Sequence, residues 1–165
     1  MFKRYKNLGG NSSIECFEIG RDYIALVFKG MKHMYVYPLA LLGSNNYTQM
    51  VFLAERGQGL RGYASANCNK SYSHALVNVG ATDPSYLSTR SGGCFHVRVI
   101  DRYQGTFYSL NQRSIDAAIK DVKTKAGLPA GLSLGSFCQI VWTPSPIDEA
   151  EMDMFDDSAV IPTRS

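Results

Sequence analysis

The chain lacks the features that mark several common classes of protein. It has no run of about 20 apolar residues, which a membrane-spanning helix needs. Residues 1–10 carry three basic side chains but not the apolar segment of a signal peptide. We therefore expect a soluble, cytoplasmic protein that makes no contact with a membrane.

Closely spaced cysteines and paired carboxylates are also lacking. The four cysteines contain no Cys-x-x-Cys pair, so we expect reduced, mostly buried thiols at Cys16, Cys68, Cys94 and Cys138. Cys94 and His96 are two possible metal ligands on one strand face, but further ligands could only be brought to them by folding. No recognisable Cys and His signature of nucleophilic catalysis and no cluster of paired carboxylates occurs in the body of the chain. We expect no enzyme activity, no catalytic residues, no metal and no cofactor.

Charge is unevenly distributed along the chain. From Asp148 to the C-terminus, six acids stand against one arginine, a net charge of −5. The remainder has sixteen bases and eight acids, a net charge of +8. A basic body with an acidic tail can bind an anionic partner, and the tail itself can compete for the same surface.

The first half of the chain has the pattern of a sheet covered by a helix. Residues 13–19, 23–28 and 33–37 are short segments rich in aromatic and β-branched residues, separated by turn-forming residues, and predict an antiparallel meander. Apolar residues on both faces of the second segment indicate that both faces are covered. A helix capped by Asn46 and ended by Gly57 would supply that cover.

The second half predicts a β-β-α-β unit. Residues 94–100 and 106–110 read as a hairpin, Ser114 caps an amphipathic helix that Gly127 ends, and residues 136–142 form a last strand. The fold class is therefore α+β, with a β-β-β-α unit, a β-β-α-β unit and a flexible acidic tail. The expected divisions are an extension (1–10), the first unit (11–73), a loop-rich joint (74–93), the second unit (94–143) and the tail (144–165).

Residues 11–72 contain a distinctive order of residues: Ser12, Ser13, Ile14, Ile19, Leu26, Val27, Phe28, Gly30, Tyr35, Val36, Tyr37, Pro38, Ala54, Gly59, Tyr63, Asn67 and Tyr72. This order resembles the KTSC domain, a module of about sixty residues. The Tyr-x-Tyr at Tyr35 and Tyr37 is the best mark. The domain occurs at the C-terminus of some lysyl-tRNA synthetases and alone in bacterial and phage proteins. The resemblance implies a β-β-β-α fold and RNA binding, the role usually suggested for this family.

Tyrosine is abundant, with ten residues, and several tyrosines stand near basic side chains. Aromatic rings stack on unpaired bases while Lys and Arg bind phosphates, so this mixture favours single-stranded nucleic acid. The candidate binding residues are Tyr35, Tyr37, Arg56, Arg61, Tyr63, Lys70, Arg98 and Arg102. A second interpretation stays open for Tyr35 and Tyr37, because tyrosines are also ordinary residues of a half-buried sheet.

Gly57, Gly59 and Gly62 form a Gly-x-Gly-x-x-Gly pattern. It follows a predicted helix rather than a strand, which excludes the context of a dinucleotide site. Two interpretations remain: a tight loop, or a turn whose backbone N–H groups bind an anion beside Arg61.

The tail places Met152, Met154 and Phe155 among acids. A segment this polar is predicted not to fold alone, but its apolar residues offer a protein partner a point of contact. A plain solubilising role is the alternative.

The leading hypothesis is a non-catalytic protein that binds RNA or single-stranded nucleic acid, with a tail for autoinhibition or partner recruitment. The first alternative is a phage or bacterial accessory protein that acts by protein–protein assembly, including homo-oligomers, in the host cytoplasm or the virion. The second is a sensor or sponge for an anionic nucleotide.

Overall fold

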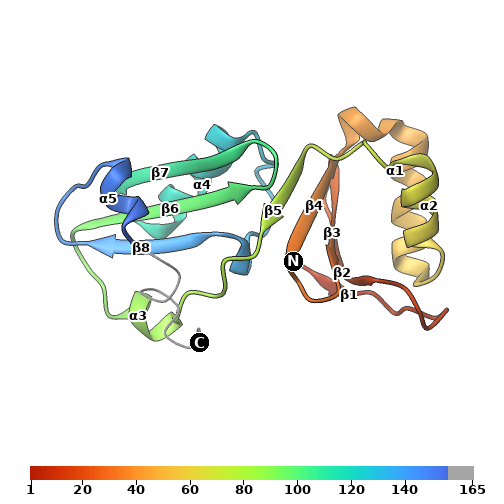
Figure 1. The fold of residues 1–165 in the computed structure, drawn as a ribbon, viewed down its shortest axis with the longest axis horizontal. Coiled ribbons are helices and arrows are strands. Elements are labelled where there is room, and N and C mark those ends of the chain that lie inside the picture. Colours follow the sequence, from red (N-terminus) through yellow and green to blue (C-terminus); the bar gives the residue numbers. More distant parts are fainter. Residues whose placement is uncertain (156–165) are drawn as a thin grey trace. The chain divides into compact units, whose positions relative to one another are not determined.

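A computed structural model describes residues 1–155, and these form two compact units. Unit 1 comprises residues 1–76 together with the short segment 131–133, and unit 2 comprises 77–130 and the residues from 134 onward. Each unit contains an antiparallel sheet with helices (Figure 1), so the expected α+β class is confirmed. No helix within the described range is long and apolar enough to cross a membrane.

Unit 1 is built on four antiparallel strands in the order β1 to β4. They are β1 (Lys3–Arg4), β2 (Ile14–Ile19), β3 (Tyr23–Phe28) and β4 (His33–Pro38). Leu26 of β3 pairs with Phe17 on one side and Tyr35 on the other. Every residue of β3 from Tyr23 to Val27 is buried, as its apolar residues on both faces predicted.

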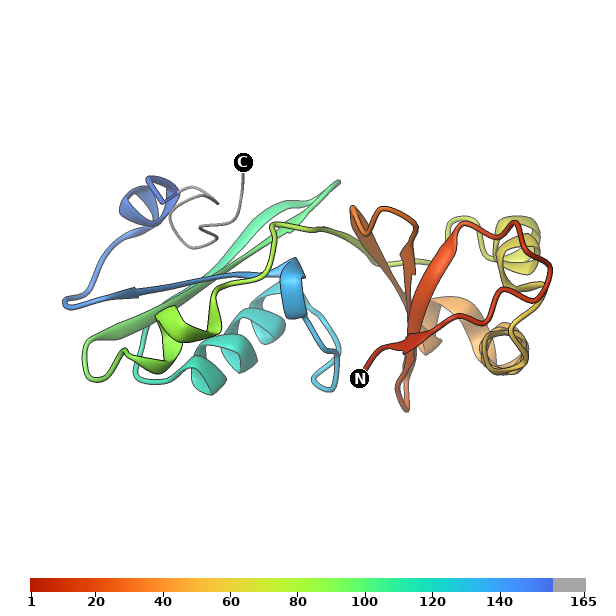
Figure 2. The same cartoon turned by 90° about the horizontal axis from the view of Figure 1, so that it is seen from below.

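Two helices cover one face of this sheet. They are α1 (Leu39–Arg56) and α2 (Leu60–Asn67), and Figure 2 shows both on the same side of the strands. Their buried side chains, among them Met50 and Leu60, pack with Ile24 and Leu26 of β3 in one core cluster. The sheet and this pair of helices form the framework on which the candidate site is built.

Helix α1 begins earlier than expected. Pro38, not Asn46, is its N-cap, and the side chain of Asn46 donates to the backbone oxygen of Leu42 at 3.1 Å. Gly43 interrupts the helix with φ 77°, a conformation that glycine adopts without steric cost. The chain thus makes one turn of helix, bends, and resumes helix until the left-handed Gly57 ends it, as predicted.

Unit 2 has a three-stranded sheet in the order β7, β6, β8. The strands are β6 (Cys94–Asp101), β7 (Gly105–Gln112) and β8 (Gln139–Thr143), and β6 pairs antiparallel with both neighbours. The last strand starts three residues later than expected, because a 3-10 helix occupies Gly135–Phe137. Two short elements precede this sheet: β5 (His74–Val77), where the units divide, and α3 (Pro84–Ser88).

Helices lie on both faces of the unit 2 sheet (Figure 2). On one face is α4 (Ile115–Ala126), whose N-cap Ser114 accepts a hydrogen bond from the Ala117 N–H at 3.1 Å. Its C-cap is Gly127, and its buried side chains lie on one face of the helix, as the sequence predicted. On the other face is α5 (Glu149–Asp153).

The tail is ordered as far as the structure describes it, contrary to the expected flexibility from residue 144. Asp148 and Glu151 form a capping box around α5. Met152 is fully buried and packs with Val141, Tyr108 and Leu110 of the sheet. A helix this short is not stable alone, so the docking of Met152 on the sheet maintains it. The rest of the expected tail, 156–165, lies outside the described residues.

Candidate functional site

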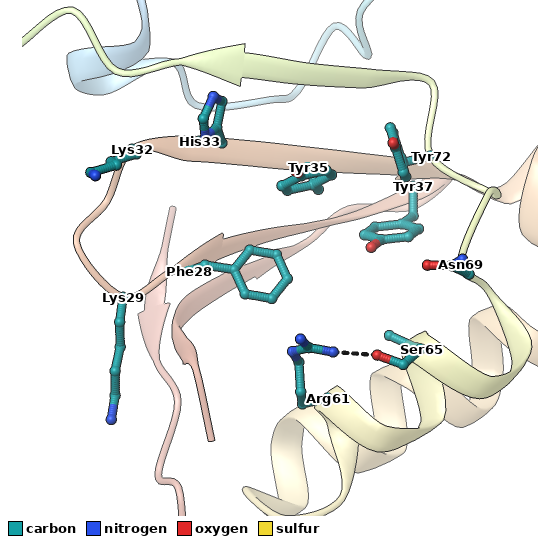
Figure 3. Close-up of a pocket in the computed structure, with 11 residues that line it drawn as sticks. Phe28, Lys29, Lys32, His33, Tyr35, Tyr37, Arg61, Ser65, Asn69 and Tyr72 are labelled. Atoms are coloured by element: carbon teal, nitrogen blue, oxygen red, sulfur yellow. Dashed lines mark hydrogen bonds between the residues drawn. The ribbon is translucent and has the colours of Figure 1, made fainter. Parts of the chain in front are cut away.

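A pocket of about 390 Å³ opens in unit 1 between the strands and α2. Its walls come from three parts of the chain: the end of β3 with the turn that follows it, the positions of β4 that share a face with Tyr35, and α2 with the residues after it. Figure 3 shows its lining, which consists of Phe28, Lys29, Lys32, His33, Tyr35, Tyr37, Arg61, Ala64, Ser65, Asn69 and Tyr72. The site therefore collects residues that are up to 44 positions apart in the sequence, from Phe28 to Tyr72.

Four aromatic rings form a connected cluster in this pocket. The ring centroids of Phe28 and Tyr35 are 5.3 Å apart, and those of Tyr35 and Tyr72 are 4.8 Å apart, each pair at an interplanar angle of 89°. Tyr37 and Tyr72 are separated by 5.9 Å at 78°. These are edge-to-face arrangements, which aromatic pairs favour and which hold the rings in place.

Strand geometry explains why these rings meet. Tyr35 and Tyr37 are two residues apart on β4 and so share a face of the sheet. Leu26 is opposite Tyr35, and Phe28 follows on the same face of β3. Burial raises the pKa of Tyr37, which is 5% exposed, so its hydroxyl remains neutral.

A fixed arginine faces the aromatic cluster from α2. Arg61 Nε donates to Ser13 Oγ at 2.9 Å, and its Nη1 donates to Ser65 Oγ. The guanidinium carbon lies 5.8 Å from the centroid of the Phe28 ring, within range of a cation–π contact. These contacts hold an exposed cation at the wall of the pocket (Figure 3).

Two lysines join Arg61 at the β3–β4 turn. The backbone N–H of Lys29 donates to the Ser13 oxygen at 2.6 Å, and that of Met31 donates to Phe28 at 2.9 Å. The left-handed Gly30 and Met31 complete this tight turn, which places Lys29 and Lys32 at the pocket. None of the eleven lining residues is acidic, so the pocket has a positive electrostatic potential.

Three of the eight residues predicted to bind nucleic acid line the pocket: Tyr35, Tyr37 and Arg61. Tyr63 does not, because it packs on the core and its hydroxyl donates to Asn46 Oδ1 at 2.6 Å. Arg56 and Lys70 are exposed residues of unit 1 outside the pocket lining.

The other two predicted residues, Arg98 and Arg102, belong to unit 2. Arg98 forms an ion pair with Asp153 at 3.1 Å, and Asp153 also accepts from the Tyr108 hydroxyl at 2.6 Å. The Arg102 guanidinium carbon stands 5.3 Å from the ring centroid of Tyr103, next to it in the β6–β7 turn.

The three residues predicted for a partner-binding tail have different environments. Met152 is fully buried in its own unit, which removes it from the exposed contact surface that was expected. Met154 is 83% exposed, and Phe155 is partly buried against the same cluster as Met152.

Sequence reasoning missed several lining residues, notably Phe28, Lys29 and Asn69. Phe28 and Tyr72 both belong to the order of residues that resembles the KTSC domain, so they could have been selected as candidate site residues on that basis. Lys29 and Asn69 are solitary polar residues in turns, and no local pattern distinguishes them from solvated surface residues.

The glycine pattern lies outside this pocket and has a structural explanation. Gly57 and Gly59 are left-handed caps of α1 and α2. A Cβ atom on Gly57 would lie 2.5 Å from the Cβ of Lys6, closer than packing allows. The tight-loop interpretation is sufficient for these glycines.

The described residues contain no group of three or more His, Cys, Asp or Glu side chains placed to hold a metal ion. The four cysteines are free thiols, with Cys68 and Cys138 buried. In comparisons with known proteins, no family model, curated protein or solved structure matches this chain.

Proposed function

We propose that this protein is a non-catalytic binding protein whose unit 1 pocket binds RNA or single-stranded nucleic acid. The observation that carries the proposal is the meeting of four aromatic rings with Lys29, Lys32 and Arg61 in one pocket that has no acidic residue. The resemblance of residues 11–72 to the KTSC domain, for which RNA binding is the usual suggestion, supports the same function.

The chemistry of the pocket suits an unpaired nucleotide. A base stacked on an aromatic ring gains roughly 1–3 kcal/mol, and every base has a face that can stack. The two lysines and Arg61 supply charge for the flanking phosphates. Arg61 is already held by Ser13 and Ser65, so its side chain loses little conformational freedom on binding. Bases in a duplex are stacked on each other, so the pocket favours single strands.

In this proposal the acidic tail competes with nucleic acid for a basic side chain, Arg98. Asp153 binds Arg98 at 3.1 Å, in the way that a phosphate oxygen would bind a guanidinium group. Replacing Asp153 with Asn would remove the negative charge that pairs with Arg98 and should strengthen the binding of an anionic strand at low salt. An unchanged affinity in D153N would remove the tail from the proposal and leave the pocket.

The test is fluorescence polarisation with labelled single-stranded RNA and DNA at salt concentrations from about 50 to 200 mM. The variant that removes the two turn lysines, Lys29→Ala with Lys32→Ala, should weaken binding and reduce the salt slope by about 1.4, at roughly 0.7 per phosphate contact. The matched control is Lys3→Ala with Arg21→Ala. It removes the same charge from exposed positions of unit 1 that do not line the pocket.

Equal weakening in the lysine variant and the control would mean that net charge, not the pocket, drives binding. No binding of any strand by the natural chain would overturn the proposal. The protein–protein assembly hypothesis would then be the next to test, by measuring oligomeric state at micromolar concentration.

A free mononucleotide is a second candidate ligand, favoured by the size of the pocket. A volume of about 390 Å³ lies at the small end of the range of ligand sites. We therefore propose the aromatic pocket, rather than the glycine turn, as the site for such a nucleotide. Thermal unfolding with nucleoside monophosphates at millimolar concentration tests it, because a ligand that binds only the folded state raises the melting temperature. Stabilisation by monophosphates without affinity for oligonucleotides would favour this candidate.

A further inference from the structure

We propose that Asn69 reads the base in the unit 1 pocket and that the preferred base is adenine. This inference rests on the proposed function and specifies the ligand of the same site. It depends on three observations: where Asn69 lies, how the other polar side chains of the pocket are used, and what its amide can pair with.

Asn69 has a defined position at the end of α2. The preceding residue, Cys68, is fully buried and its N–H donates to the Ala64 oxygen at 2.9 Å. The Ser71 N–H donates to the Cys68 oxygen at 3.0 Å, which closes a turn around Asn69. The backbone on both sides of Asn69 is therefore held, and Figure 3 shows its side chain at the end of the pocket occupied by Tyr37 and Tyr72.

The amide of Asn69 is available to a ligand. The residue is exposed, and its side chain makes no hydrogen bond to any other residue that the structure describes. It is also the one carboxamide among the eleven lining residues. A carboxamide offers a donor and an acceptor side by side, which is the arrangement needed to read a base edge.

The serine and the three cations of the lining suit other tasks. Ser65 already accepts a hydrogen bond from Arg61. Lysine and arginine side chains only donate, so Lys29, Lys32 and Arg61 match phosphate oxygens. The aromatic rings would stack on the faces of the base, and the Asn69 amide would form hydrogen bonds with the edge of the base.

Adenine matches a carboxamide best. Its N6 amino group and N7 form a donor beside an acceptor, the pair that Asn recognises with two hydrogen bonds. Guanine presents two acceptors, O6 and N7, on the same edge, which Arg or Lys recognises instead. In an unpaired strand the Watson–Crick edges are also free, and adenine offers the same donor and acceptor there, at N6 and N1. Pyrimidines offer such a pair on that edge alone, and their single ring has less area for stacking than a purine has.

The experiment uses a set of labelled nine-nucleotide RNAs made of uridine, with A, G, C or U at the central position. The full chain should bind the strand with central adenine about 5-fold or more tightly than the all-uridine strand, because one bidentate contact contributes roughly 1–3 kcal/mol. Asn69→Ala should bind the strands with central adenine and central guanine alike, because both purines still stack, while keeping the salt dependence that the lysines and Arg61 provide.

Asn67→Ala is the matched control. Asn67 is an exposed asparagine at the end of α2 that does not line the pocket, and its amide donates to the Tyr63 oxygen at 3.2 Å. This variant should retain the adenine preference. Circular dichroism of each variant checks that the fold is intact.

The outcomes separate the two proposals. Salt-dependent binding that is equal for all four strands overturns the role of Asn69 but leaves the proposed function standing. A guanine preference overturns it in the same way and points to Arg61 as the reader. An adenine preference that survives Asn69→Ala also rejects it. No binding of any strand overturns the proposed function itself.

Discussion

The carboxylate of Glu18 accepts two hydrogen bonds from Ser133, 115 residues further along the chain. The Ser133 hydroxyl donates to Oε1 at 2.6 Å and its backbone N–H donates to Oε2 at 3.0 Å. The Tyr23 hydroxyl donates to Oε2 at 2.8 Å. Glu18 is only 2% exposed, so these donors compensate the loss of its hydration. The pair is the polar link by which segment 131–133 joins unit 1.

Glu18→Gln should destabilise unit 1 by about 1–3 kcal/mol. Glutamine keeps the shape of the side chain but has a single acceptor oxygen, and its NH₂ group would face groups that donate to Glu18 now. At least one buried donor would then have no acceptor. Urea unfolding followed by circular dichroism measures the change.

Glu55→Gln provides the control for this substitution. Glu55 is exposed on α1, and the same chemical change there should alter the free energy of unfolding by less than about 0.5 kcal/mol. Equal effects at the two positions would show that the contacts of Glu18 do not stabilise the fold.

The pH dependence of stability should also depend on Glu18. Burial by itself raises the pKa of this carboxyl, but hydrogen bonds from the Met1 amino group, Ser133 and Tyr23 outweigh burial and lower it below its usual value. Its stabilising contribution is complete above the unfolded-state pKa of about 4.3 and is lost as the pH falls through the lower folded-state pKa. Between about pH 5 and pH 3 the natural chain should lose more stability than Glu18→Gln does. Parallel curves for the two proteins would contradict this.

Local patterns predicted the strands and the α4 helix well. The three strands of the meander were expected within one residue of their ends, because they are short segments rich in aromatic and β-branched residues and are separated by turn residues. Ser114 and Gly127 likewise mark the ends of α4. The start of α1 was wrong because Asn46 resembles a cap, whereas Pro38 and the bend at Gly43 depend on how the helix packs. Helix α5 was missed because its stability comes from the burial of Met152 against distant strands.

The candidate site was predictable only in part, for a related reason. Tyr35, Tyr37 and Arg61 were identified from residue type and from nearby charge. Their meeting with Phe28 and Tyr72 depends on strand pairing and on the position of α2, and neither is encoded by neighbours in sequence. Arg98 shows the opposite case, since a basic residue that suggested nucleic acid is instead paired with Asp153.

His96 should make unit 2 sensitive to mild acid. The imidazole is fully buried; its Nδ1 accepts from the Asn111 N–H at 2.9 Å, so Nε2 carries the proton and donates to Thr143 Oγ1 at 2.7 Å. Burial lowers the pKa of His96. As the pH falls below about 6.5 the unfolded chain gains a proton that the folded chain resists, so stability declines towards the lower folded-state pKa.

The measurement for His96 is the free energy of unfolding between about pH 7.5 and 5, followed by the fluorescence of Trp142. This is the single tryptophan of the chain and lies in β8. His96→Gln removes the titrating group and should flatten the profile, although it lowers stability at every pH. A variant as sensitive to acid as the natural chain would assign the effect to other groups.

Met152 and Met154 form a matched pair for testing how α5 is held. Met152 is fully buried against Val141, whereas Met154, two residues later, is 83% exposed. Met152→Ala should lower the free energy that holds α5 on the sheet by about 2 kcal/mol. This is the low end for a buried methionine, because a helix this short can detach locally without unfolding the sheet. Amide hydrogen exchange in α5 should then accelerate roughly 30-fold, at 1.4 kcal/mol for each factor of ten. Met154→Ala should leave exchange unchanged. Equal acceleration in both variants would show that residue type, not burial at position 152, holds the helix on the sheet.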